Sequence, residues 1–414
     1  MSVWKVRQLL VSDEASFLVN YATPGSISWE KNIPILDATF EMPHERIMDG
    51  AAQSRIAKRG MSHIGAHQPG TLTLRMYAYG HLTTAAGALT ETTLQQLIGD
   101  GLRGNDVSMV GTTISGAAST TTTLNVADSS GVGVGDIVRG GVKGDARGEG
   151  QAYAVASITD GAPDTIVLLT ATNAAMTTAG DVVHGVQMAY FDEDVTATTK
   201  SFAMLHAGTG EQWIAHGCEL SGLKITYPMG GTPEAELTYR VADYQRSAIT
   251  FPNATALGDD FCAPVAGGSF FINDVGTTTR ALITPSRVEL NITLGLEPII
   301  GPGSTLGTYG FITGWVRTAF NATVTVDKPW ATDEETFWDT ANQSITAKHI
   351  LFTASAVNGR AIGFRAPRVL PSGQRPNGPV NVNGQTYHTV TWELDEGATI
   401  TNDLIRAPLV LFFG

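Results

Sequence analysis

Apolar and polar residues alternate along several short segments of the chain, with the period of two that is typical of a β-strand. In residues 71–79, for example, Leu72, Leu74 and Met76 fall on one face and polar residues fall on the other. The same alternation recurs in residues 235–241, 286–294 and 387–394. Each segment is predicted to form a strand with one face toward a core and the other toward solvent or a lumen.

Helices are predicted at two places. Residues 91–98 place three apolar residues on one stripe, and Gly99 is predicted to end this helix as its C′ glycine. Residues 332–347 begin with a capping box formed by Thr332 and Glu335, and an apolar residue then recurs at every fourth position. Helices are therefore few, and the second one is expected to lie on a sheet.

Local differences in amino-acid composition divide the chain into units. Aromatic residues almost vanish between residues 111 and 186, where short strand candidates alternate with turn residues. We interpret this stretch as a small β-barrel inserted into a larger domain, and a stretch rich in turn residues as a linker between two larger units. The predicted units are residues 1–110 with 187–250, the inserted barrel 111–186, the linker 251–269, and a second unit 270–414 with an exposed loop at 370–383.

The predicted fold class is mainly β. Both larger units follow the same plan of alternating strands with one short helix between them, so they are interpreted as two tandem units that arose by duplication. No residue-level repeat accompanies this plan, and the duplication remains a hypothesis at this point.

Composition narrows the function. The 414 residues carry 39 acidic and 26 basic side chains, a net charge of −13, which disfavours tight binding of nucleic acid because such binding relies on Lys and Arg. Hydrophobic residues make up 43% and charged residues 16%, which excludes a disordered chain. Cys218 and Cys262 form neither a disulfide framework nor a metal-knuckle spacing. No signal peptide or apolar membrane span is predicted, so the protein is expected to be made in the cytosol.

Several motifs are candidates for catalytic or binding sites. The glycine-rich residues 131–135 lack the spacing and the following Lys of a nucleotide-binding loop, so a plain turn is predicted. His63 and His67 have the helical spacing of zinc ligands, but glycines and a proline crowd the segment and favour a loop. The acidic residues 192–194 lack the pattern of a calcium loop, and a charged loop is predicted there.

His216 and Cys218 suggest a thiolate paired with an imidazole, since two residues apart on a strand they would share a face. No group that would orient the histidine is identifiable, so a structural cysteine is predicted instead. No nucleophile elbow or pair of catalytic carboxylates stands out. The sequence therefore favours a structural protein without catalytic residues, cofactor or metal.

Two regions resemble a known family. Residues 200–205, 212–227 and 230–239 form a strand with the pattern Gly-Cys-x-Leu-x-x-Leu-x-Ile, a Gly/Pro turn and an alternating strand. Together they resemble the tail tube protein of tailed, siphophage-like bacteriophages. Residues 283–298, 310–317 and 322–326 are similar to the later half of such proteins, and residues 29–86 fit their early portion more loosely. The resemblance covers about three quarters of the chain.

The resemblance implies β-sandwich or barrel protomers that assemble into stacked rings around a channel, with three protomers in a pseudo-six-fold ring or six protomers. It also implies a virion protein, assembled in the bacterial cytoplasm, whose partners are its own copies, a tape-measure protein, a tail terminator, and baseplate or distal tail proteins. The protein would contact double-stranded DNA only while the DNA passes through the channel. No membrane partner is implied, and a flexible, non-contractile tail is favoured.

A channel that passes DNA should repel phosphates, and an acidic chain repeated around rings can give its lumen a negative potential. Polar faces of two predicted strands are candidates for that lining, and solvated outer faces are the alternative for each of them. The candidate residues are Glu236, Thr238, Arg240, Arg287, Glu289 and Asn291. The inserted barrel is expected on the outside of the tube, since it would obstruct the lumen.

Two other functions stay open. One alternative is another virion surface protein, such as a capsid decoration or an adhesion module, and aromatic residues clustered on a loop would favour it. An all-β glycan-active enzyme is the third reading, and it requires two carboxylates that converge in a cleft.

Overall fold

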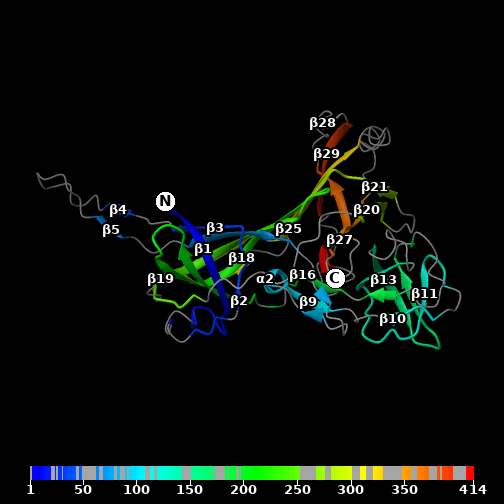
Figure 1. Ribbon diagram of the computed structural model, residues 1–414, viewed down its shortest axis with the longest axis horizontal. Helices are drawn as coiled ribbons and strands as arrows, with labels where there is room; N and C mark the ends of the chain where they lie inside the picture. Colours follow the sequence, from blue (N-terminus) through cyan, green and yellow to red (C-terminus); the bar gives the residue numbers. More distant parts are fainter. Residues whose placement is uncertain are drawn as a thin grey trace, which may run out of the picture.

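The structure is a computed structural model of the 414-residue chain. It describes residues 2–414 except 20–23, 25–26, 30, 43–45, 49–61, 65–68, 79–81, 84–88, 91–92, 108–111, 116–118, 142–150, 170, 173–181, 185, 193–194, 196, 252–266, 276–280, 301–307, 314–319, 330–346, 356–360, 373–379, 383–384 and 395–406. The described part is mainly β, as the alternating segments predict. Figure 1 shows strands at both ends of an elongated molecule, with β25 running between them.

A closed barrel of six antiparallel strands lies at one end. Its order is β1–β3–β6–β19–β18–β17, and β17 returns to β1. The alternating segment around Leu72 forms β6, in which every second residue is buried. The strands are β1 (Ser2–Asp13), β3 (Asp37–Met42), β6 (Gly70–Tyr77), β17 (Lys200–His206), β18 (Gln212–Pro228) and β19 (Glu234–Arg246).

Strand β18 is shared with a second, open half-barrel. Its first half pairs with β17, and its second half pairs on the same side with β22. From β22 the sheet continues through β25, β29, β27, β26 and β20. The strands are β20 (Gly267–Asp274), β21 (Ala281–Ile283), β22 (Arg287–Leu294), β25 (Phe320–Pro329), β26 (Lys348–Ser355), β27 (Ile362–Pro371), β28 (Val380–Val382) and β29 (Gln385–Leu394).

Three further strands extend the large sheet from β27 of the half-barrel. Strand β30 (Val410–Phe413) pairs with β27 on one side and with β16 (Gln187–Phe191) on the other, and β16 also pairs with β9 (Arg103–Val107). Shorter strands complete the structure: β2 (Lys31–Asn32), β4 (Arg46–Met48), β5 (Ser62–Ile64), β7 (Leu82–Thr83), β8 (Leu89–Thr90), β23 (Leu296–Ile300) and β24 (Thr308–Thr313).

The predicted inserted stretch forms a separate six-stranded sheet in the order β10–β15–β12–β13–β14–β11. A bridge between Ile114 and Val126 brings its two edge strands together, so we call it the small barrel. Its β13 contacts β26 of the half-barrel, and Ile137 and Ala152 share a buried cluster with Leu351. The strands are β10 (Thr112–Thr113), β11 (Thr123–Val126), β12 (Ile137–Gly141), β13 (Gln151–Thr159), β14 (Asp164–Leu168) and β15 (Val182–His184).

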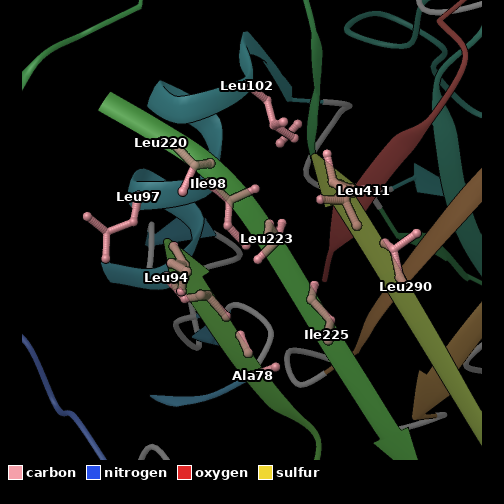
Figure 2. Close-up of a cluster of buried hydrophobic side chains, with 14 of the residues drawn as sticks. Ala78, Leu94, Leu97, Ile98, Leu102, Leu220, Leu223, Ile225, Leu290 and Leu411 are labelled. Carbon is pink, nitrogen blue, oxygen red and sulfur yellow. The ribbon is translucent and has the colours of Figure 1, made fainter. Parts of the chain in front are cut away.

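Helix α2 (Thr93–Leu102) confirms the first predicted helix but runs past its predicted end. Gly99 lies inside the helix rather than at C′, and a Cβ at this position would lie 2.0 Å from Oδ1 of Asn105. The glycine therefore serves close packing. The helix ends instead at Arg103, which has a left-handed φ of 77°. Figure 2 shows Ile98 of the helix beside Leu220 and Leu223 of β18.

One hydrophobic core runs through both the closed barrel and the half-barrel. In the half-barrel, Tyr227 of β18 meets Phe352 of β26 edge to face at 4.9 Å between ring centroids, and Phe364 of β27 lies 5.5 Å from Phe352. Aromatic pairs at such distances add to the stability that burial provides. The hydrophobic core is therefore continuous across residue 250, where the first predicted unit ends. The domain limits and the duplication stay predictions.

Three sequence predictions fall wholly or partly on residues that the structure does not describe, and two of them need correction. The helix at 332–347 lies outside them except for Ala347, and so does most of the linker 251–269. The linker prediction extends too far, because β20 already begins at Gly267 and pairs with β26. The predicted loop 370–383 is also too long, since Pro371 ends β27 and Val380–Val382 forms β28.

Replacing Gly363 by Ala tests the packing of the half-barrel. A Cβ on this β27 residue would lie 2.1 Å from the carbonyl oxygen of Phe352 and 2.3 Å from Cζ of Phe412. We expect Gly363→Ala to lower the free energy of unfolding by about 1–3 kcal/mol, measured by denaturant titration. Gly222→Ala on β18 is the matched control, because its nearest atoms lie 3.6 and 3.8 Å away. Equal stability of the two variants would contradict this packing.

Candidate functional site

The six candidate lining residues all lie on one face of one sheet. Strand β18 joins β19, which carries Glu236, to β22, which carries Asn291, because Lys224 pairs with both of them. Directly paired residues of neighbouring strands share a face. One row of this face runs across seven strands and consists of Asp37, Arg75, Glu236, Lys224, Asn291, Thr323 and Glu393.

A second, parallel row contains only uncharged residues. It consists of Thr39, Thr73, Thr238, Gly222, Thr293 and Asn321. We call the polar side of the strands β3, β6, β19, β18, β22, β25 and β29 the polar face. The opposite side of the same strands is apolar and buried, with Leu237, Leu223 and Leu290 at no more than 1% exposure. Figure 2 shows this apolar side, where α2 packs on β18.

Three cations on the polar face are held by carboxylates, whereas Arg240 is exposed and has no ion pair among the described residues. Glu289 accepts from two of them: Nζ of Lys224 lies 3.0 Å from its Oε1, and Arg287 donates to its Oε2. Arg75 donates to Glu234, and this contact raises the pKa of the Arg75 guanidinium. The acidic side chains outnumber the basic ones on this face, since Asp37, Glu41, Glu236, Asp327 and Glu393 add to the two paired glutamates.

The polar face holds one shallow hollow of about 190 Å³. It is lined by Arg75, Lys224, Thr226, Glu234, Ala235 and Glu236. Two carboxylates therefore lie at one depression, which is the arrangement that a glycan-active enzyme would need. Glu234, however, is already engaged by Arg75, so the hollow is better described as part of the network of paired charges.

The pair His216 and Cys218 does not share a face, contrary to the sequence prediction. Gly217 between them has a φ of 58°, and the ladder with β17 shifts its register at this point. Such a bulge changes the face of the sheet toward which the following side chains point. Cys218 joins Ala215 in the hydrophobic core, where burial first and the charge of Glu14 second raise the pKa of the thiol. This environment agrees with a structural cysteine.

His216 belongs instead to a buried polar network that sequence reasoning missed. Its Nδ1 lies 3.2 Å from Oγ of Ser201, and its Nε2 lies 2.9 Å from Nε2 of Gln245. Ser201 donates to Oε1 of Glu14 at 2.6 Å. No sequence motif could reveal this network, because Glu14 directly follows β1, Ser201 comes from β17 and His216 from β18.

The direction of these hydrogen bonds argues against a nucleophilic serine. The proton of Ser201 is donated to Glu14, so His216 donates from Nδ1 to Ser201 and accepts from Gln245 at Nε2. A catalytic histidine would have to accept the serine proton while an acid holds its other nitrogen. Ser201 and His216 are also fully buried. We therefore interpret the network as structural.

Glu14 is the centre of this network. Its Oε1 accepts from Ser201 and from the N–H of Gly217 at 3.0 Å, and its Oε2 accepts from the N–H of Leu18 at 2.9 Å and from Thr199 at 3.3 Å. Each carboxylate oxygen thus accepts two hydrogen bonds. The side chain ties the end of β1 to the bulge in β18.

A second buried charge connects α2 to the barrel. Lys200 of β17 is 2% exposed, and its Nζ lies 2.5 Å from Asp13 of β1 and 2.6 Å from Asp100 of α2. Tyr239 of β19 also donates to the carbonyl oxygen of Leu97 at 3.5 Å. These contacts fix the helix on the apolar side of the sheet that carries the polar face.

Glu219 lies on β18 close to the place where its neighbour changes from β17 to β22, and it is 8% exposed. Burial raises the pKa of its carboxyl from 4.5 to about 7, against the opposing charge of Arg103. Arg103 itself lies over the ring of Phe191 at 5.7 Å. Glu219 therefore exchanges its proton near neutral pH.

The pH dependence of stability tests this placement of Glu219. Because its pKa is higher in the folded than in the unfolded chain, the folded state binds more protons between pH 4.5 and about 7. Stability is therefore lost as the pH rises through this window, by about 3 kcal/mol in total. We expect Glu219→Gln to remove this part of the dependence, measured as the melting temperature from pH 4 to 8. An unchanged profile would contradict the burial of this carboxyl.

The remaining motifs form no site among the described residues. Residues 131–135 form a turn, in which Gly131 and Gly135 have positive φ values of 85° and 96°. His63 lies in β5 and not in a helix, while His67 lies outside the described residues. Asp192 is described without its neighbours 193 and 194. Within the described ranges, no group of three or more His, Cys, Asp or Glu is placed to hold a metal ion.

No model of a known protein family matches the chain. No curated protein matches its sequence. Among the described residues, no helix is long and apolar enough to cross a membrane.

Proposed function

We propose that this chain is a structural virion protein that polymerises into stacked rings, and that these rings form the hollow tail tube through which a bacteriophage delivers its DNA. The observation that carries the proposal is the polar face. It extends without interruption across seven strands from both the closed barrel and the half-barrel. The wall of a tube needs such a sheet, with one face buried in the protein and the other exposed to solvent.

The chemistry of the polar face suits a surface along which DNA slides. DNA is held by Lys and Arg side chains that neutralise its phosphates. On this face Lys224, Arg287 and Arg75 are occupied by Glu289 and Glu234, and further carboxylates surround them. One uncharged row, made mostly of threonines, runs beside the charged row. The face would therefore repel or ignore phosphates.

Strand edges offer a route to ring closure. Among the described residues, β9 pairs only with β16, and β28 pairs only with β29. Free edges favour pairing with another chain, and a closed ring of copies satisfies them. In this proposal three copies form a pseudo-six-fold ring or six copies form the ring. Tape-measure, tail terminator and distal tail proteins are the further partners.

The small barrel fits the outside of such a tube. It contacts β26 of the half-barrel, whereas the polar face lies on β3, β6, β19, β18, β22, β25 and β29. The small barrel thus contacts a strand that carries none of the polar-face residues, which supports a place for it beside the polar face and away from the lumen. A capsid decoration or adhesion module is the alternative function, and a glycan-active enzyme that uses the hollow at Glu234 and Glu236 is a weaker one.

Negative-stain electron microscopy of the purified chain, before and after concentration, tests the proposal. We expect hollow filaments of even width with stacked rings. Compact monomers at every concentration would contradict it and would favour the adhesion module. Hydrolysis of a panel of glycans that is lost in Glu236→Gln would favour the enzyme.

A further inference from the structure

Three buried polar side chains lie together on adjacent strands of the half-barrel, on the face turned away from its main core. Ser269 of β20 pairs directly with Thr353 of β26. Arg365 of β27 pairs with Leu351, two residues from Thr353 and on the same face. Their exposures are 5%, 1% and 3%, so all three are enclosed by the protein.

The polar atoms of these side chains have no hydrogen-bond partner among the described residues. The unpaired atoms are Oγ of Ser269, Oγ1 of Thr353, and Nε and Nη1 of Arg365. Buried polar groups are almost always paired, and an unpaired buried charge is especially unfavourable. Three such groups side by side therefore call for an acceptor that the chain itself does not provide here.

The neighbours of Arg365 supply no compensating charge. Burial alone lowers the pKa of its guanidinium to about 10, with no contribution from a carboxylate. Across the adjoining ladder, Arg365 pairs with Val410 of β30, and the ring of Phe412 lies against Gly363. Leu351, Val410 and Phe412 form the cluster that receives Ile137 of the small barrel. The three polar groups thus share the face on which the small barrel docks.

The donor set identifies the missing acceptor. A guanidinium and two hydroxyl groups can all donate hydrogen bonds, and a guanidinium in an apolar setting favours a negatively charged oxygen. Because the three side chains are enclosed, the acceptor would have to be a small solute rather than a side chain of another protein. We propose that Ser269, Thr353 and Arg365 form a binding site for a small oxyanion of the phosphate type, on the face of the half-barrel where the small barrel docks.

This site is independent of the tube function, and its expected effect is stabilisation. An anion bound there neutralises Arg365 and joins β20, β26 and β27. A ligand that binds only the folded chain raises the melting temperature in a saturable way. We expect a rise of about 2–4 °C when millimolar chloride is replaced by inorganic phosphate at equal ionic strength.

The test compares Arg365→Met with Arg368→Met in the full chain. Arg368 is exposed on the same strand, three residues away, and is the matched control. We expect the phosphate-dependent rise in wild type and in Arg368→Met, and none in Arg365→Met. In chloride, Arg365→Met should melt at or above the temperature of wild type, because an apolar side chain replaces an unpaired buried charge.

A second measurement keeps the test decisive if Arg365→Met does not fold. Equilibrium dialysis of wild type against labelled inorganic phosphate should give saturable binding of one anion per chain, weakened at least about threefold in Thr353→Val, which loses a hydroxyl of nearly the same shape. Equal temperature shifts in all variants would indicate a general salt effect, or an adventitious ion only, and would overturn the proposal. Absence of saturable binding to wild type would overturn it as well.

Discussion

Assembled Glu289→Gln protein is expected to retain duplex DNA that the wild-type protein releases. Glu289 holds both Lys224 and Arg287, whose side chains are 43% and 49% exposed, so its neutralisation frees two cations on every copy. A ring of three copies would gain six free cations, which corresponds to a salt slope of about −5 for DNA binding. We therefore expect affinity for a short duplex to rise about a hundredfold or more at low salt. Co-sedimentation with concentrated, assembled protein measures it.

Glu393→Gln is the matched control for this effect. It removes the same charge from the same face, but Glu393 is exposed and its described surroundings include no ion pair. We expect the affinity of this variant for DNA to change by less than about threefold, because only a screened repulsion between Glu393 and the DNA phosphates is lost. Equal effects of the two variants would show that net charge alone matters. No change in Glu289→Gln would contradict the masking of cations on the polar face.

Glu14→Gln is expected to destabilise the closed barrel strongly. An amide nitrogen in place of one carboxylate oxygen would face two donors, either Ser201 and the N–H of Gly217 or Leu18 and Thr199. Hydrogen bonds to a charged group contribute about 1.5–3 kcal/mol each, so the loss of two amounts to about 4 kcal/mol. Differential scanning calorimetry should show the melting temperature lowered by about 5 °C.

Glu236→Gln makes the same chemical change on the exposed polar face and serves as the control. We expect its stability to stay within about 0.5 kcal/mol of wild type. A similar loss in both variants would mean that the carboxylate network around Glu14 is not what connects β1 to the bulge. A loss confined to Glu14→Gln would support it.

Strands were predictable from the sequence wherever one face is buried. In β6, β19, β22 and β29 the alternation of residues matches the alternation of burial, because a period of two leaves only one register that buries the apolar side. For the same reason the six polar residues of β19 and β22 lie on the side turned away from the core, and their place in a lumen stays a prediction. Their union on a single face was not predictable, since it depends on β18 pairing with both strands.

Features that depend on local backbone geometry escaped sequence reasoning. The bulge at Gly217 separates His216 from Cys218, and a glycine there gives no sign of whether it makes a turn or a bulge. Gly99 is a similar case, because the close approach of Asn105 and not helix termination explains it. The network of Glu14, Ser201 and His216 joins residues far apart in the chain, so no spacing could indicate it.

The most direct test places an electron-dense label on the polar face and on the small barrel of the assembled protein. Asn291→Cys and Asp160→Cys would each carry a maleimide gold cluster, in a chain with Cys262→Ser; Cys218 is fully buried, and both labelled positions are exposed. In end-on electron micrographs of rings, we expect gold inside the bore for Asn291→Cys and on the outer rim for Asp160→Cys. Gold outside the ring at position 291 would contradict a polar face that lines the channel.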